Sequence, residues 1–173
     1  MERVAKFYKV SFERFAEDLR AAAPDMVWTD AGLREIYEGI RLPLRATEGS
    51  AGYDFYLPYS LRLAPGEGVK IVTGIRAKIA PGWVLMNVPK SGLGFRFRLQ
   101  MDNTVGVIDS DYFNSDNEGH IMAKLTNDSR SGKTVELTAG KAFMQGLFLP
   151  FGITEDDAAT GIRNGGFGST EKA

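Results

Sequence analysis

The chain has 173 residues, of which 43% are hydrophobic and 25% charged, a composition typical of a single globular domain with a buried core. Its 21 Lys and Arg residues nearly balance 22 Asp and Glu residues, and no basic block stands out, which argues against a nucleic-acid polymer as partner. There is no cysteine, which excludes disulfides and thiolate chemistry, and no apolar run approaches the ~18 residues of a membrane span.

Residues 1–39 differ in pattern from the rest of the chain, and we expect them to form a helical extension. Met1–Val10 lacks the continuous apolar stretch of a signal peptide, so a cytoplasmic protein without a membrane partner is expected. Apolar residues recur at helical spacing over Phe12–Leu19, and a second short helix is predicted from Asp30. Since an apolar helix stripe is usually buried, we interpret the extension as packed on the body or on a neighbouring subunit. The alternative is a lid or a partner-binding element.

From Ile40 onward the pattern changes to short strands separated by turns, which predicts an all-β sandwich or barrel. Pro65-Gly66 and Pro81-Gly82 are two of the turn signals. The expected strands are Ala51–Leu57, Leu61–Leu63, Val69–Ile79, Trp83–Val88, Thr104–Ile108, Ile121–Leu125, Val135–Leu137 and Phe143–Phe151. No internal repeat and no linker divides residues 40–153.

The stretch Asn103–Tyr112 combines a strand, two carboxylates and an aromatic ring. Gly106 lies within the strand, and a glycine there often marks a place where a ligand approaches the backbone closely. The strand leads into Asp109 and Tyr112, a carboxylate beside a ring, which is what a nucleotide pocket needs. The alternative is a hairpin in which the Asp-Ser-Asp sequence only bonds to its own backbone.

Other segments carry phosphate or acid–base character. Lys90-Ser91-Gly92 offers a cation, a hydroxyl and an unhindered backbone N–H in consecutive positions. Asp54 stands inside a strand, where Asp is depleted, and Gln145 stands inside an apolar strand, where its amide needs a partner if it is buried. The only histidine, His120, has no triad or metal set around it, so we interpret it as structural.

Residues 154–173 are acidic and then glycine-rich, so they are expected to form a mobile C-terminal arm. Within this arm Arg163, Phe167, Ser169 and Thr170 stand among glycines. A guanidinium and hydroxyls suit phosphate oxygens, and a phenyl ring suits a base, so the arm can close over an anionic, aromatic ligand. The alternative is a flexible terminus of accidental composition.

Taken in order, these segments resemble the five motifs of the trimeric dUTPase family. The motifs are Ala51–Asp54, Pro89–Leu93, Asn103–Tyr112, Gly140–Gln145 and Arg163–Thr170. The resemblance implies a jelly-roll-like β-barrel or sandwich, a homotrimer with shared active sites, and Mg²⁺-dependent hydrolysis of dUTP to dUMP and pyrophosphate, which lowers dUTP and supplies dUMP for thymidylate synthesis. It divides the chain into a helical extension (1–39), a β domain (40–153) and an arm (154–173) that closes the site of a neighbouring subunit.

The resemblance also implies a role for each site residue. Asp109 is expected to be the general base that activates water for attack on the α-phosphorus, and Tyr112 is expected to lie against the deoxyribose and to exclude a 2′-hydroxyl. Asp54 is expected near magnesium, in its outer shell and through water. The implied substrate-binding residues are Lys90, Ser91, Gly92, Asn103, Gly106, Val107, Ile108, Gln145, Arg163, Phe167, Gly168, Ser169 and Thr170.

The chain departs from the family pattern in its first 39 residues and in Phe113–Glu118, which are inserted after the third motif. The fifth motif is one residue shorter than the commonest spacing. The nearest enzymatic alternative, dCTP deaminase, shares the β fold but would need a glutamate base near the pyrimidine. A nucleotide-responsive binding module that contacts a protein through residues 1–39 or the insertion is an alternative from another class, and a purely structural β trimer is a third.

Overall fold

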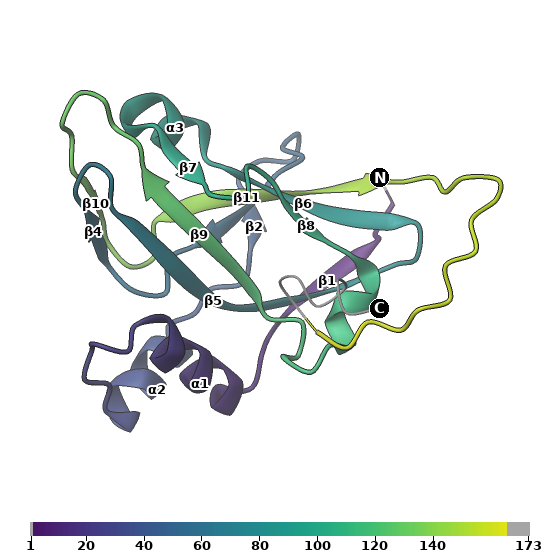
Figure 1. Cartoon of the computed structure of the whole chain (residues 1–173), viewed down its shortest axis with the longest axis horizontal. Helices are drawn as coiled ribbons and strands as arrows, with labels where there is room; N and C mark the ends of the chain where they lie inside the picture. Colours follow the sequence, from purple (N-terminus) through teal and green to yellow (C-terminus); the bar gives the residue numbers. More distant parts are fainter. Residues whose placement is uncertain (1, 166–173) are drawn as a thin grey trace.

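The computed structural model describes residues 2–165. It consists mainly of two antiparallel β-sheets that pack face to face (Figure 1). One sheet has the order β1-β5-β9-β7, formed by Ala5–Lys9, Gly68–Ile79, Ile121–Asn127 and Leu99–Met101. The other has the order β2-β3-β11-β6-β8, formed by Leu44–Arg45, Tyr53–Tyr56, Ala142–Pro150, Trp83–Pro89 and Gly106–Ile108. A short pair, β4 (Leu61–Leu63) and β10 (Val135–Leu137), completes the body. The expected all-β, jelly-roll-like class is confirmed.

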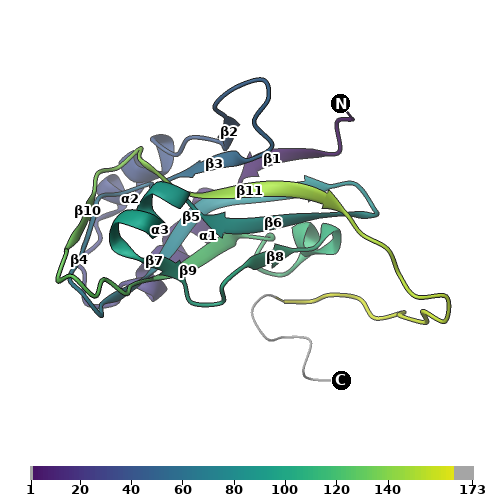
Figure 2. The ribbon, with the colours of Figure 1, turned by 90° about the horizontal axis from the view of Figure 1, so that it is seen from above.

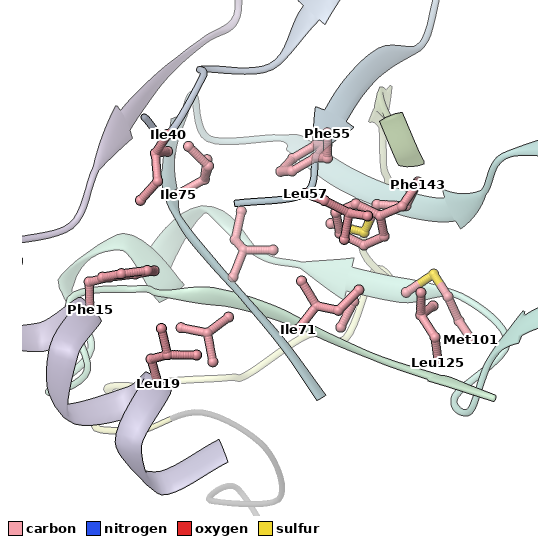
Figure 3. Packing of buried hydrophobic residues seen from close by; sticks show 14 of the residues in the cluster. Phe15, Leu19, Ile40, Phe55, Leu57, Ile71, Ile75, Met101, Leu125 and Phe143 are labelled. Carbon is pink, nitrogen blue, oxygen red and sulfur yellow. The ribbon is translucent and has the colours of Figure 1, made fainter. Parts of the chain in front are cut away.

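The core lies between the sheets and follows from the alternation of apolar residues along each strand. Successive side chains of a strand point to opposite faces, so β9 buries Ile121, Ala123 and Leu125 on a single face. Figure 3 shows Phe55 and Phe143 of the second sheet meeting this layer from the other side. Burial of each large side chain contributes about 1.5–3 kcal/mol relative to exposure, which makes this layer the main source of stability.

The N-terminal extension contains the two expected helices, and it packs on the body. Helix α1 (Phe12–Ala22) and helix α2 (Asp30–Glu38) lie beneath β5 in Figure 1. Phe15 and Leu33, one from each helix, are fully buried and join the same core as the sheets. Before the helices, β1 pairs with β5 from Ala5 opposite Ile79 to Lys9 opposite Ile75. This strand was not expected, since its partner lies some seventy residues further along the chain.

Three local details also differ from the expected elements. Strand β8 begins at Gly106 rather than at Thr104, because Thr104 has a left-handed backbone with φ of 64°. The Lys90-Ser91-Gly92 segment leads into a short helix, α3 (Ser91–Phe97), rather than a simple turn. Asp109 is followed by a 3-10 helix, η1 (Ser110–Asn114). These short helices place the polar residues that follow β6 and β8.

The chain beyond β11 has no helix or strand as far as Gly165. Figures 1 and 2 show this segment leaving the sheet and curving back beside the body, and at Arg163 it reaches the end of β8. Phe167, Gly168, Ser169 and Thr170 lie outside the described residues. No helix within residues 2–165 combines the length and the apolar character needed to cross a lipid bilayer.

Candidate active site

Asp109 lies where β8 ends and η1 begins, in contact with the C-terminal arm. Arg163 Nη2 lies 2.5 Å from Asp109 Oδ2, and Arg163 Nε lies 3.1 Å from Asp111 Oδ1. The same guanidinium is 5.8 Å from the centre of the Tyr112 ring. The third and fifth motifs therefore meet within one chain, with one cation shared by two carboxylates and an aromatic ring.

Hydrogen bonds at its hydroxyl group hold the Tyr112 side chain in place. The ring is buried, Tyr112 Oη donates a hydrogen bond to the His120 carbonyl (2.9 Å), and Asn117 Nδ2 donates to Tyr112 Oη (2.7 Å). Burial raises the pKa of Tyr112, although the hydrogen bond from Asn117 opposes this. The hydroxyl therefore stays protonated near neutral pH and acts as a fixed anchor. Asn117, in the inserted segment, has a role that the motif pattern did not reveal.

The residues expected to read the base occupy the turn before β8 and β8 itself. Asn103 is exposed in a tight turn, in which the Thr104 N–H donates to the Met101 carbonyl (2.8 Å). Gly106 is buried and faces Asn87 of β6, whereas Val107 is 57% exposed and Ile108 is half-buried. β8 is the edge of its sheet, and an edge strand presents backbone N–H and C=O groups outward.

A second polar cluster lies where β6 ends. Lys90 Nζ is 2.7 Å from Asp54 Oδ1, so the first and second motifs are joined by an ion pair. Gln145 of β11 faces Asp54 across the sheet. A Cβ atom at Gly52 would lie only 2.6 Å from Gln145 Oε1, so a side chain at this position would displace the Gln145 amide.

The expected phosphate contacts border an open hollow beside this cluster. Ser91 and Gly92 are exposed at the start of α3. The hollow, of about 510 Å³, is lined by Lys90, Gly92, Arg96 and Glu136 among others. Lys90 is already paired with Asp54, so Arg96 adds the further positive charge in this lining that suits an anionic group.

The two clusters lie at opposite ends of β6. Leu85 of β6 faces Ile108 of β8 in an antiparallel register, so Asp109 lies beside Val84. Lys90 directly follows β6, six residues beyond Val84, so at ~3.3 Å per residue the two clusters are roughly 20 Å apart. In the expected site, the phosphate assigned to Lys90 and the water assigned to Asp109 must meet within a few ångströms. One subunit therefore does not bring the two clusters of the expected site together.

The donor chemistry fits a magnesium ion that arrives with its ligand. Within residues 2–165, no group of three or more His, Cys, Asp or Glu side chains is placed to hold a metal. Asp54 is a lone carboxylate whose Oδ1 is already paired with Lys90. Mg²⁺ keeps several waters and binds phosphate oxygens readily, so an outer-shell contact to Asp54 through water is compatible with this geometry.

Comparisons with known proteins agree with the motif pattern. The family model described as dUTPase matches residues 38–171. The deoxyuridine 5′-triphosphate nucleotidohydrolase of Lactococcus lactis subsp. lactis (strain IL1403) is 40% identical over 135 residues, covering 76% of this chain and 89% of that protein. The crystal structure of a Streptococcus mutans dUTPase superimposes with a TM-score of 0.60 at 38% identity, covering 68% of this chain and 91% of that one.

A further solved structure resembles this chain in fold alone. A mutant dUTPase from phage phi11 of S. aureus, described with a structural Mg(II) ion, superimposes with a TM-score of 0.59 at 20% identity, covering 74% of this chain and 95% of that one. The family model and the identities near 40% confirm the resemblance seen in the motifs. The chain belongs to the dUTPase family.

Proposed function

We propose that this protein hydrolyses dUTP to dUMP and pyrophosphate in active sites shared between subunits, with Asp109 as the general base. Membership of the dUTPase family supports the reaction. The observation that carries the mechanism is the meeting of Asp109, Tyr112 and Arg163 at the end of edge strand β8. These residues supply a base, an aromatic wall and a cation for a nucleoside triphosphate.

Asp109 acts chiefly by placing the attacking water. An aspartate is a weak base, so correct orientation of the water toward the α-phosphorus must provide much of its effect. In the substrate-free chain Asp109 is paired with Arg163. A triphosphate carries more negative charge than one carboxylate and competes for the guanidinium, which releases Asp109 for the water.

Specificity for deoxyuridine comes from β8 and Tyr112. Asn103 and the edge backbone of Gly106, Val107 and Ile108 offer donors and acceptors for the uracil ring. A backbone-lined slot is narrow, so it rejects the methyl group of thymine by its size and cytosine by mismatched hydrogen bonds. Tyr112 lies against the deoxyribose and leaves no room for a 2′-hydroxyl.

The separation of the two clusters supports a homotrimer in which each site combines different subunits. Lys90, Ser91, Gly92 and Gln145 of one subunit then bind the phosphates of a nucleotide whose base and sugar lie on β8 of the next. Exposed apolar side chains on the two edge strands of this sheet, Leu44 of β2 and Val107 of β8, supply surface for such an interface.

Mixing two inactive variants tests the sharing directly. Asp109→Asn and Lys90→Ala each destroy one cluster, and subunit exchange between them rebuilds intact sites only if each site uses two chains. We expect activity to reappear in the mixture, with the trimeric mass measured by light scattering. A monomeric but active protein contradicts the shared site.

Magnesium would be held by the triphosphate and by water, with Asp54 in its outer shell through water, and it would supply positive charge to offset the charge of the phosphates. The pairing of Asp54 with Lys90 keeps both side chains beside the phosphates. Once the triphosphate has released Arg163 from Asp109 of its own chain, the arm, residues 154–173, closes the site of a neighbouring subunit. Arg163, Ser169 and Thr170 bind distal phosphates there, with Phe167 over the base and Gly168 among the substrate contacts. Residues 1–39 form the N-terminal extension, and residues 40–153 form the β domain.

We place the reaction in the cytoplasm, and cell fractionation tests this location.

The decisive measurement is pyrophosphate release from dUTP, dCTP, dTTP and UTP with Mg²⁺. We expect release from dUTP, lost in Asp109→Asn and largely retained in Asp111→Asn, which removes the same charge from the same loop. Ammonia released from dCTP would identify a deaminase instead. Tight binding of dUTP without turnover would favour the nucleotide-responsive binding module.

A further inference from the structure

His120 connects the N-terminal extension to the body through both of its ring nitrogens. Its side chain is fully buried, and Nε2 accepts a hydrogen bond from the Gly74 backbone N–H (2.8 Å). The proton of the neutral ring must then lie on Nδ1, which donates to Asp18 Oδ2 of helix α1 (2.6 Å). The ring cannot rotate without breaking both bonds, so Asp18 and Gly74 together fix the position of His120.

The backbone of His120 in turn fixes Tyr112. Its carbonyl accepts the hydrogen bond from Tyr112 Oη (2.9 Å). Gly119 has φ of 67°, and a Cβ atom there would lie 2.6 Å from the Tyr112 carbonyl oxygen, so the chain doubles back tightly against Tyr112. A displacement of His120 therefore displaces the anchor of the Tyr112 ring.

A second tie joins the extension to the inserted segment. The Ser11 N–H and Ser11 Oγ donate to the two carboxylate oxygens of Glu118, at 2.8 and 2.5 Å. Glu118 follows Asn117, the residue that donates to Tyr112 Oη. The two segments that depart from the five-motif pattern thus bind each other, and they do so behind the ring expected to contact the sugar.

We propose that Asp18 is a positioning residue, which holds the Tyr112 ring in place through His120 and thereby sets the discrimination between dUTP and UTP. The inference rests on the proposed placement of Tyr112 against the deoxyribose. Rejection of UTP depends on excluding one hydroxyl group, so a small shift of the ring admits it. A binding or catalytic group that is misplaced by about 1 Å can reduce the rate on the order of 100-fold. The N-terminal extension then helps to determine the preference for dUTP over UTP.

The test compares kcat/KM for dUTP and for UTP in Asp18→Ala, Asp18→Asn and Glu17→Ala. Glu17 is the adjacent carboxylate on α1 and pairs with Arg14, so it is a matched control. We expect Asp18→Ala to lower the ratio of the two constants roughly tenfold, with most of the loss in kcat for dUTP. Asp18→Asn keeps an oxygen that accepts from Nδ1 and should restore the ratio, and Glu17→Ala should leave it unchanged. A folded Asp18→Ala protein with the wild-type ratio overturns the proposal.

If Asp18→Ala does not fold, Asp18→Leu replaces it, because leucine keeps a similar branched shape but offers no acceptor to His120 Nδ1. We expect the ratio to fall in Asp18→Leu as well, and a wild-type ratio in the folded protein overturns the proposal. Tyr112→Ala distinguishes the contact between Tyr112 and the sugar from the role of the extension. If Tyr112→Ala still discriminates dUTP from UTP, Tyr112 does not contact the sugar. If Tyr112→Ala loses this discrimination but Asp18→Ala keeps the wild-type ratio, only the role of the extension is refuted.

Discussion

Replacing Arg163 by alanine should reduce activity far more than stability. The guanidinium forms ion pairs with Asp109 and Asp111, whose side chains are 43% and 57% exposed. Exposed pairs are screened by water, so together they contribute roughly 0–1 kcal/mol to folding. Charge-assisted hydrogen bonds to a bound phosphate are worth about 1.5–3 kcal/mol each, which corresponds to a loss of roughly 10- to 150-fold in kcat/KM.

The assay pairs steady-state hydrolysis of dUTP with urea denaturation of the same preparations. Arg98→Ala is the control, because Arg98 also forms an ion pair with a surface aspartate, Asp128 (3.0 Å). The control should show the same small change in stability without loss of activity. Arg163→Lys should recover only part of the activity, since lysine keeps the charge but not the fork. Unchanged kcat/KM in Arg163→Ala would refute the assignment of this residue to the phosphates.

Other expected outcomes concern the core, the loop behind Tyr112, and the ionic conditions. Phe143→Ala removes a fully buried ring and should lower the free energy of unfolding by about 3–5 kcal/mol, measured by denaturant titration; a loss below about 1 kcal/mol contradicts the packing described. Gly119→Ala should destabilise the protein by at least about 1–2 kcal/mol and lower kcat, since its positive φ and the nearby Tyr112 carbonyl leave no room for a methyl group. Burial alone would raise the pKa of Glu118, but the hydrogen bonds from Ser11 and the nearby arginines outweigh it and lower the pKa below 4.5. The stabilisation that ionised Glu118 gives the folded protein is therefore complete above the usual glutamate pKa and is lost as pH falls through the lowered pKa. The difference in unfolding free energy between wild type and Glu118→Gln should accordingly shrink in acid. A pH-independent difference argues against a charged Glu118. Chelation of Mg²⁺ should abolish hydrolysis while leaving the melting temperature of the substrate-free protein unchanged, and a large drop on chelation would indicate a structural ion.

Local patterns in the sequence account for most of the elements. Apolar alternation and Pro-Gly turns predicted β5, β6, β9 and β11 nearly to their ends, because these signals act over neighbouring residues. The helical spacing of the apolar residues over Phe12–Leu19 predicted α1 in the same way. Strand β1 was missed because its five residues make a weak local pattern and become a strand only by pairing with β5.

In the candidate site, too, some features follow from local sequence and others from the packing of the folded chain. Residue type and order in the five motifs are local properties, and they were enough to predict roles for Asp109, Tyr112 and Lys90. The position of Asp109 and Lys90 at opposite ends of β6 depends instead on strand register, which arises only when the sheet forms. The tertiary structure alone also brought Asp18, 102 residues away in sequence, to the ring of His120. Such contacts depend on how helices and sheets pack, and residue order along the chain carries no signal for them.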